Sequence, residues 1–331
     1  MLPLTYVFEF DHGDDEMRRY ILREFADSGA EHLVLGSYFF RAIIGSPAAA
    51  KTFEKEMESA GLSFVDSHAF YGPAGDLYLP AGPARRKMIA LHRLCLEIAA
   101  DFGVRTMAVH VGDRHEIVEG IPTDELHANI IQSLGELLPY AEQRGIVLCL
   151  ENTYNICNTP ERLLDAVEHF HSPYLGLCYD SGHANLMDKG RDFPDSNPFK
   201  AWKDVPPQFD DRILEKMLPH VVNCHLHDNN GIVDQHYNPG RGTVDWKHIV
   251  GLLKQAPRLQ VIQSEVIPVR VHDSIRDICS KFANWANWRQ CKKSQSVFFV
   301  SHQKYSTGTL GTAARTVNQL RSAAGNCRPG Q

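Results

Sequence analysis

Residues 220–242 read HVVNCHLHDNNGIVDQHYNPGRG and join a β-rich apolar run to a segment crowded with metal-ligand side chains. The run HVVNCHLH has the composition and length of a buried strand. Histidine and aspartate then recur over a few residues, at His225, His227, Asp228, Asp234 and His236. Nitrogen and oxygen donors gathered in this way favour a divalent cation such as Zn, Mn, Mg or Fe, and the glycines of PGRG allow a backbone bend.

Other short apolar runs occur along the chain, and longer amphipathic segments separate them. Helical patterns cover residues 15–28, 84–102, 124–144 and 160–170, and a glycine that can close a helix precedes several runs. Strands that are apolar on both faces and alternate with helices pair in parallel. The pattern therefore predicts a (β/α)8 TIM barrel, with eight parallel strands and an outer ring of helices. The predicted strands are 4–10, 31–36, 62–68, 104–110, 146–152, 174–180, 220–227 and 259–266.

Strands three to eight each finish on a residue type that binds metal ions. The carboxyl ends of all strands meet at one face of a TIM barrel, where active sites of this fold form. Clustered carboxylates are costly to keep there without a cation, so we expect the strand ends to converge on a metal ion. The following loops add His183, Asp234 and His236. The strand-end residues are His68, His110, Glu151, Asp180, His225 and Glu265.

Composition favours one cytoplasmic barrel domain followed by a tail. With 331 residues, 43% of them hydrophobic, the chain can bury a large core, and we expect the barrel to occupy residues 1–291. We expect no membrane segment and no signal peptide, and the eight cysteines form no C-x-x-C pair, which indicates reduced thiols. Residues 292–331 carry six Lys/Arg and no Asp/Glu, and they predict a disordered or loosely docked tail. The remaining 28 Lys/Arg against 40 Asp/Glu disfavour a broad nucleic-acid surface.

Several motifs resemble one family. LCLEN (148–152), LCYDSGHANL (177–186), CHLHDNNGIVDQHYNPGRGTVDW (224–246) and SEV (264–266) are similar to segments of the sugar phosphate isomerase/epimerase family of xylose isomerase-like TIM barrels. That superfamily also contains endonuclease IV. The resemblance covers roughly residues 4–290 and implies a divalent-metal-dependent isomerase or epimerase.

The resemblance also implies roles for individual residues. In the sugar enzymes, residues placed like Glu151, Asp180, His225 and Glu265 hold the ion, and the two glutamates exchange a proton next to the substrate carbonyl through a metal-stabilised enediolate. A histidine placed like His183 contacts the substrate. The expected cofactor is one divalent ion (Mn, Zn, Mg or Co), with donors for up to three. The expected partner is a small-molecule sugar or sugar phosphate.

Endonuclease IV offers an alternative, which is a trinuclear-metal phosphoester hydrolase of the AP endonuclease type. Nucleic acid is a partner only under this alternative. The chain departs from the usual nuclease motifs, because it has HVGD at 110–113 and HLHD at 225–228. All residue types of the trinuclear ligand set are nevertheless present, at His68, His110, Glu151, Asp180, His183, His225, Asp234, His236 and Glu265.

Further residues carry open alternatives. Asn152 either contacts substrate or braces its loop, and His227 either orients a ligand or contacts substrate. Tyr71 is a candidate for an apolar substrate wall. Arg241 either meets a substrate phosphate or is a solvated loop residue. The long proline-rich connection at 187–209 is a candidate lid or contact in a homo-oligomer.

Overall fold

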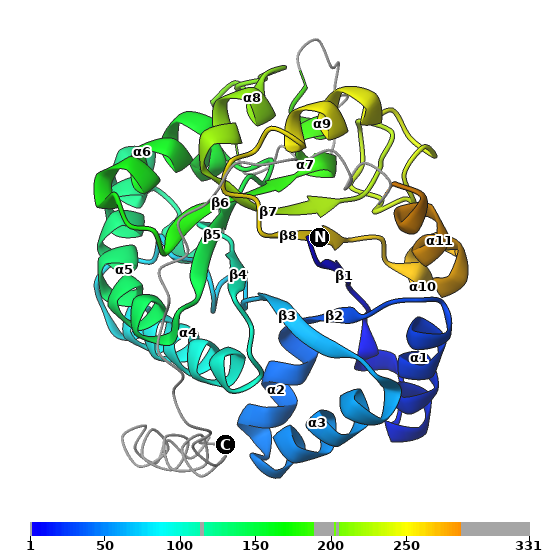
Figure 1. Ribbon diagram of the computed structural model, residues 1–331. Helices are drawn as coiled ribbons and strands as arrows, with labels where there is room; N and C mark the ends of the chain where they lie inside the picture. The colour runs from blue at the N-terminus through cyan, green and yellow to red at the C-terminus, as the bar shows by residue number, and fades with distance from the viewer. Residues whose placement is uncertain (1, 113–115, 189–201, 203–204, 286–331) are drawn as a thin grey trace.

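Each predicted run forms a strand, and the strands pair in parallel in chain order. The last strand pairs with the first, so the sheet closes into a barrel (Figure 1). The predicted TIM barrel is therefore confirmed. The strands are β1 (Leu4–Tyr6), β2 (His32–Leu35), β3 (Ser63–His68), β4 (Thr106–Val109), β5 (Val147–Glu151), β6 (Leu175–Asp180), β7 (Val221–Leu226) and β8 (Val261–Ser264).

The computed structural model describes residues 2–112, 116–188, 202 and 205–285. The predicted tail and most of the proline-rich connection after β6 lie outside these residues. Among the described residues, no helix combines the length and apolarity needed to cross a bilayer. The described cysteines are free and buried, as expected of reduced thiols.

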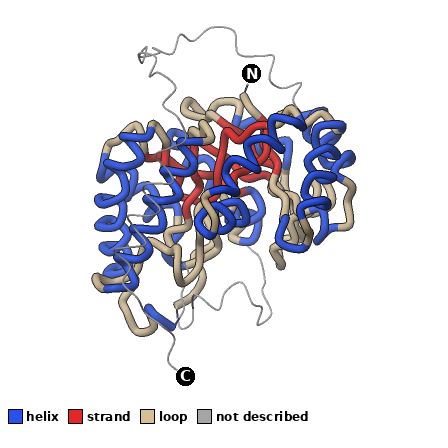
Figure 2. The backbone as a smooth tube through the Cα atoms, turned by 90° about the horizontal axis from the view of Figure 1, so that it is seen from below, coloured by secondary structure: helices blue, strands red, loops and turns tan. Residues whose placement is uncertain are grey.

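Helices surround the strands on the outside of the barrel (Figures 1 and 2). The four predicted helices form, and each end agrees with the prediction to within one residue. Short 3-10 turns are η1 (Phe10–His12), η2 (Glu116–Val118), η3 (Ile156–Asn158) and η5 (Leu218–His220). The α-helices are α1 (Asp15–Asp27), α2 (Ser37–Gly45), α3 (Ala48–Ala60), α4 (Pro83–Asp101), α5 (Thr123–Arg144), α6 (Pro160–Phe170), α7 (Ser181–Leu186), α8 (Ile213–Met217), α9 (Trp246–Leu253), α10 (Pro268–Val271) and α11 (Ile275–Trp285).

Glycine closes two of these helices in the predicted way. Gly61 follows α3 with φ of 71°, and Gly145 follows α5 with φ of 68°. These left-handed angles strain a residue that has a Cβ atom, whereas glycine adopts them freely. Each glycine turns the chain back so that the next strand can begin within a few residues.

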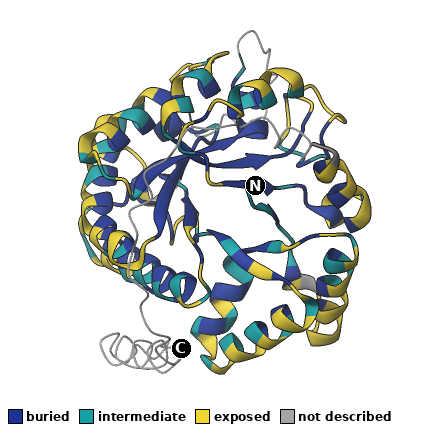
Figure 3. Cartoon of the chain, in the orientation of Figure 1, coloured by how far each residue is buried: buried dark blue, intermediate teal, exposed yellow. Residues whose placement is uncertain are grey.

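The main apolar core lies between the strands and the helices. The buried strands form the centre in Figure 3, and the outward faces of the helices are exposed. Phe39 of α2 lies edge to face with Phe53 of α3 and Phe64 of β3, with ring centroids 5.0 Å apart in both pairs. Such contacts fix each helix against the outer surface of its neighbouring strands.

The barrel interior carries a polar layer. Asp66 Oδ1 of β3 accepts hydrogen bonds from Thr106 Oγ1 of β4 at 2.7 Å and from Asn223 Nδ2 of β7 at 2.9 Å. Burial raises the pKa of Asp66, although His225 and these two hydrogen bonds oppose the change. Asp66 precedes His68 by two residues, and Asn223 precedes His225 by two. Strand alternation therefore places this layer directly beneath two candidate metal ligands.

A buried arginine ties α1 to α2 and α3. Arg18 is 4% exposed, and it donates through Nε and Nη2 to the carboxylate of Glu56 at 2.7 and 3.0 Å. Its Nη1 donates to the Tyr38 hydroxyl at 2.9 Å and to Asp15 at 2.8 Å. A two-pronged contact of this kind holds a guanidinium and a carboxylate in one geometry.

We predict that Arg18→Ala lowers the free energy of unfolding by about 3 kcal/mol, because it leaves Glu56 charged and largely buried without its main partner. Urea denaturation followed by circular dichroism measures the change. Arg19→Ala is the matched control, since Arg19 is 47% exposed and lies 3.5 Å from the same carboxylate. Its effect should stay below about 1 kcal/mol. Equal effects of the two substitutions would contradict this account.

Candidate metal centre

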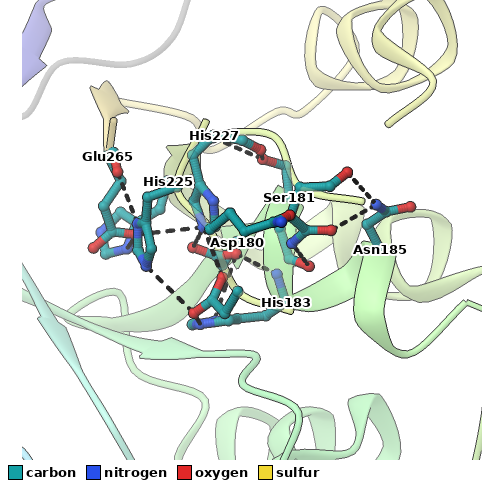
Figure 4. Close-up of polar contacts among 12 residues, drawn as sticks. Asp180, Ser181, His183, Asn185, His225, His227 and Glu265 are labelled. Atoms are coloured by element: carbon teal, nitrogen blue, oxygen red, sulfur yellow. Dashed lines mark hydrogen bonds and ion pairs between the residues drawn. The ribbon is translucent and has the colours of Figure 1, made fainter. Parts of the chain in front are cut away.

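The predicted strand-end residues lie together at one mouth of the barrel. Glu151, Asp180 and His225 are at most 1% exposed, so the centre of the group is shielded from water. Figure 4 shows part of the group, with side chains from β6, β7 and the segment after β8 directed toward one another. Three of these residues are the last residues of their strands: His68 of β3, Glu151 of β5 and Asp180 of β6. His225 is the next-to-last residue of β7. The other two directly follow a strand, His110 after β4 and Glu265 after β8.

Glu151 is the hub of this group. Its Oε2 lies 3.3 Å from His68 Nε2 and 3.4 Å from His110 Nε2. The same oxygen lies 3.3 Å from His225 Nδ1, and Oε1 lies 3.2 Å from His183 Nδ1. One carboxylate therefore faces imidazoles from four separate segments of the chain.

The loop residues extend the group on the side of α7. Asp234 Oδ2 lies 3.2 Å from His183 Nε2 and 3.3 Å from His236 Nε2. Asp180 is the N-cap of α7, where its Oδ1 accepts a hydrogen bond from the His183 backbone N–H at 2.6 Å. The cap thus fixes His183 relative to the end of β6.

Asp228 anchors the loop that carries Asp234 and His236. Its Oδ2 accepts hydrogen bonds from the backbone N–H of Gly240 at 2.8 Å and from Trp246 Nε1 at 2.9 Å. Its side chain is fully buried. Asp228 therefore acts as a structural acceptor that folds the loop back on β7.

Two histidines have their ring orientation set by backbone carbonyl groups. His68 Nδ1 lies 2.9 Å from the Ala69 oxygen, and His236 Nδ1 lies 2.8 Å from the Glu265 oxygen. A carbonyl oxygen only accepts, so Nδ1 carries the hydrogen and Nε2 faces the carboxylates. His236 also has a φ of 53°, a left-handed angle that is uncommon outside glycine and is found at functional sites.

His227 is buried among the candidate metal ligands. It is fully buried, with Nε2 3.1 Å from Asp180 Oδ2 and its ring stacked on His236 at 4.0 Å between centroids. A Cβ atom at Gly182 would come within 1.9 Å of the His227 ring, so glycine makes room for it. Strand alternation from His225 was the only sequence signal for this placement.

Asn152 and Tyr71 differ in their exposure to the mouth. Asn152 Nδ2 donates to the Asp180 carbonyl at 3.0 Å, and its Oδ1 accepts from the Asp180 N–H at 2.8 Å. Both polar ends of Asn152 thus brace β5 against β6.

Tyr71 is 59% exposed and stacks on His110 with centroids 4.9 Å apart, so it can reach a bound molecule.

Arg241 lies away from the group. Its Nη1 donates to Asp273 at 2.8 Å and to the Val271 carbonyl at 3.3 Å, and its guanidinium lies over the Tyr237 ring. It does not line the cavity at the barrel mouth. The alternative of a loop arginine with local partners therefore fits the described residues.

Two carboxylates of this group, Glu151 and Glu265, are held in their charged form. Burial opposes ionisation, but His110 and His225 keep the pKa of Glu151 well below its usual value. Burial also raises the pKa of Glu265, but the nearby His225 outweighs burial, so this pKa is lowered as well. The site therefore concentrates negative charge in a region of low water content.

The pKa values of four histidines of the group are raised, those of His68, His183, His225 and His236. Burial lowers the pKa of His236, but Asp234 outweighs it and raises the pKa to about 9. Burial likewise disfavours charged His183, yet Asp180 and Asp234 raise its pKa well above the usual value. The carboxylates thus attract positive charge, which protons or a metal ion can supply.

The donor set fits a divalent cation. Glu151 Oε2, His225 Nδ1, Asp234 Oδ1 and Glu265 Oε2 are buried and make no hydrogen bond within the described residues. Tetrahedral bonds of about 2.0–2.1 Å to N and O ligands would separate neighbouring donor atoms by about 3.3–3.4 Å. The contacts around Glu151 Oε2 measure 3.3–3.4 Å. Overlapping triads that could hold an ion include His68–His110–Glu151 and Asp180–His183–His227.

A cavity of about 460 Å³ opens above this group. The candidate ligands line one side of it, and the ends of β1 and β2 with the start of α2 line the other. The second side contributes Val7, Phe8, Glu9, Asp11, Val34, Gly36, Ser37, Tyr38, Phe39 and Arg41.

A closed (β/α)8 barrel with buried His/Asp/Glu clusters at its mouth defines a TIM-barrel protein with candidate metal sites. Comparison with known proteins assigns the family. The chain belongs to the xylose isomerase-like TIM barrel family, whose model matches residues 23–263.

Curated relatives are distant. MJ1311 of Methanocaldococcus jannaschii, described as uncharacterised, is 26% identical over 215 residues, which are 64% of this chain and 67% of that protein. A probable endonuclease 4 of Geobacter sulfurreducens is 26% identical over 211 residues, which are 62% of this chain and 68% of the relative.

Solved structures share the fold at low identity. A D-tagatose 3-epimerase-like protein superposes with a TM-score of 0.65 at 21% identity, covering 87% of this chain and 99% of the other. D-psicose 3-epimerase from Clostridium cellulolyticum H10, solved with D-tagatose, gives 0.62 at 13% identity and covers 88% and 100%. The IOLI protein, solved with a zinc atom, gives 0.62 at 16% identity and covers 87% and 98%.

We predict that Asp180→Asn weakens divalent-metal binding by about tenfold or more, because it removes a charged oxygen donor while keeping the N-cap of α7. Isothermal titration of the metal-stripped protein with Zn²⁺ or Mn²⁺ measures the affinity. Asp245→Asn is the matched control, because Asp245 is the N-cap of α9 and accepts from the His248 backbone N–H outside the metal group. Unchanged affinity in Asp180→Asn would remove Asp180 from the ligand set.

Proposed function

We propose that the protein is a divalent-metal-dependent isomerase or epimerase that acts on a sugar by proton transfer next to a carbonyl group. One observation carries the proposal. His225 Nδ1 lies 3.3 Å from Oε2 of Glu151 and 3.4 Å from Oε2 of Glu265, so carboxylates from β5 and from the end of β8 meet at one point. Two carboxylates so placed can take a proton from a substrate carbon and return one to it. The fold shared with D-tagatose 3-epimerase-like and D-psicose 3-epimerase structures supports this chemistry.

Glu151, Asp180, His225 and Glu265 would hold the ion in this proposal. When bound, a divalent cation polarises the substrate carbonyl and stabilises the negative charge that develops on its oxygen. The zinc in the IOLI protein structure supports a metal in this fold.

The chain's own groups supply the proton transfer and the positioning. The lowered pKa values of Glu151 and Glu265 keep both as carboxylates. The carboxylate that accepts the substrate proton becomes a carboxylic acid, and that acid is the donor when a proton returns to carbon. His68 and His183 line the cavity beside them and present ring nitrogens to substrate hydroxyl groups. Tyr71 lines the same cavity, where its ring would lie against the substrate.

We predict that Glu151→Gln and Glu265→Gln each lower turnover of the accepted ketose by about 10²–10⁴-fold, because an amide cannot carry the transferred proton. The assay is product formation in D₂O, followed by NMR, where proton transfer through the enzyme introduces deuterium at the reacting carbon. Metal content and the melting temperature verify that each variant is folded.

Glu142→Gln, on an exposed position of α5, is the control and should keep full activity. Full activity of either site variant would refute the two-carboxylate mechanism.

A second candidate function is phosphoester hydrolysis with several ions. The structure gathers overlapping donor triads, and the endonuclease 4 relative supports this alternative. Glu151 and its neighbours His68 and His225 would be among the residues that hold the ions, which would activate a water molecule and stabilise the leaving oxygen.

Metal stoichiometry separates the two candidates. We expect elemental analysis of the purified, metal-supplemented protein to give one ion per chain, with turnover of a ketose panel and none of abasic-site DNA. Three ions per chain together with DNA cleavage would favour the hydrolase and overturn the first proposal.

A further inference from the structure

Two ion pairs that involve the segment after β1 line the cavity. Arg41 of α2 pairs with Asp11, and Arg270 of α10 pairs with Glu9. All four residues line the cavity. Figure 1 shows α2 and α10 on either side of β1, so the segment after β1 is held by a guanidinium at each flank. We call these four residues the rim pairs.

The rim pairs contain every arginine and lysine that lines the cavity among the described residues. Their two positive charges face the two negative charges of Glu9 and Asp11, which lie in the same wall. The other acidic lining residues are Glu151, Asp234 and Glu265. No lysine or arginine of this lining is therefore left to balance an additional anion.

A sugar phosphate would bring a charge of about −1.5 to −2 into this space at neutral pH. Phosphate sites usually supply arginine or lysine that can turn its donors toward the phosphate oxygens. Here both guanidiniums already face carboxylates, and a phosphate that displaced those contacts would stand beside Glu9 and Asp11. Repulsion between like charges disfavours one ligand relative to another, and proteins use it as a source of specificity.

An uncharged sugar meets a suitable surface at the same place. A paired guanidinium keeps further N–H donors and a carboxylate keeps further lone pairs, so each rim pair offers both to hydroxyl groups. Phe8 and Tyr38 supply apolar surface in the same wall for the carbon chain. The volume of about 460 Å³ leaves room for the substrate above the metal group.

We propose that the substrate is an uncharged, unphosphorylated polyhydroxy carbonyl compound, and that Glu9 and Asp11 exclude phosphorylated sugars by holding Arg270 and Arg41. The inference rests on the proposed sugar isomerase or epimerase function. It makes Glu9 and Asp11 specificity-determining residues for that reaction.

The test is the double variant Glu9→Gln with Asp11→Asn, which keeps side-chain shape and releases both arginines. We expect its kcat/KM for a ketose phosphate, relative to the matching free ketose, to rise by about tenfold or more over wild type. Wild type should prefer the free ketose. If the double variant melts at a lower temperature than wild type, the same measurement is made on each single variant.

Glu58→Gln with Glu142→Gln is the matched control, because it makes the same change in net charge at exposed positions on α3 and α5. Its substrate preference should equal that of wild type. A shift in the control as large as in the rim variant would assign the effect to net charge and overturn the proposal.

A binding measurement keeps this test independent of catalysis. Isothermal titration with inorganic phosphate, at equal metal content, should show tighter binding to the rim variant than to wild type. Wild-type preference for the phosphorylated ketose, or no gain of phosphate binding in the variant, would overturn the inference. Absence of turnover with every sugar would count against the proposed function alone, and the phosphate titration would still decide the role of the rim pairs.

Discussion

Buried negative charge at the barrel mouth is the constraint on which the rest of the site depends. A carboxylate removed from water is stable only beside positive charge or hydrogen-bond donors. Glu151 meets this need with imidazoles, and Asp180 meets it with the N-terminus of α7 and His227. Neighbouring residues hold these carboxylates in position. Asn152, for example, binds the backbone of Asp180 through both of its polar side-chain ends. The same arrangement suits a divalent cation.

The closed barrel divides the mouth into two arcs with different chemistry. β3 to β8 carry the candidate ligands, whereas the segments after β1 and β2, together with Arg270 of α10 after β8, carry the rim pairs and the aromatic side chains. Because all strands point the same way around a ring, both arcs face one cavity. In the functions proposed above, the ligand-bearing arc would select the cation and the rim pairs would select the molecule that approaches it.

The polar layer under the metal group departs from the usual barrel interior, which is filled by branched apolar side chains. Asp66 bonds to Thr106 on the next strand and to Asn223 across the barrel. These bonds satisfy groups that would otherwise be costly to bury. They also link the strands that carry His68 and His225, so the positions of those two histidines are coupled through the interior.

The sequence by itself determined the order of strands and helices and the ligand-type residues at the ends of strands three to eight. Those features depend on local periodicity and on the rule that parallel strands in a barrel share one mouth, so they can be read residue by residue. Tertiary structure alone decided that Arg41 faces Asp11, that Arg241 turns to Asp273, and that the His227 ring rests against Gly182. These contacts join segments far apart in the chain, and their geometry depends on how loops fold over the barrel. No pattern within one segment encodes the distance between two such side chains, because closure of the whole barrel sets it.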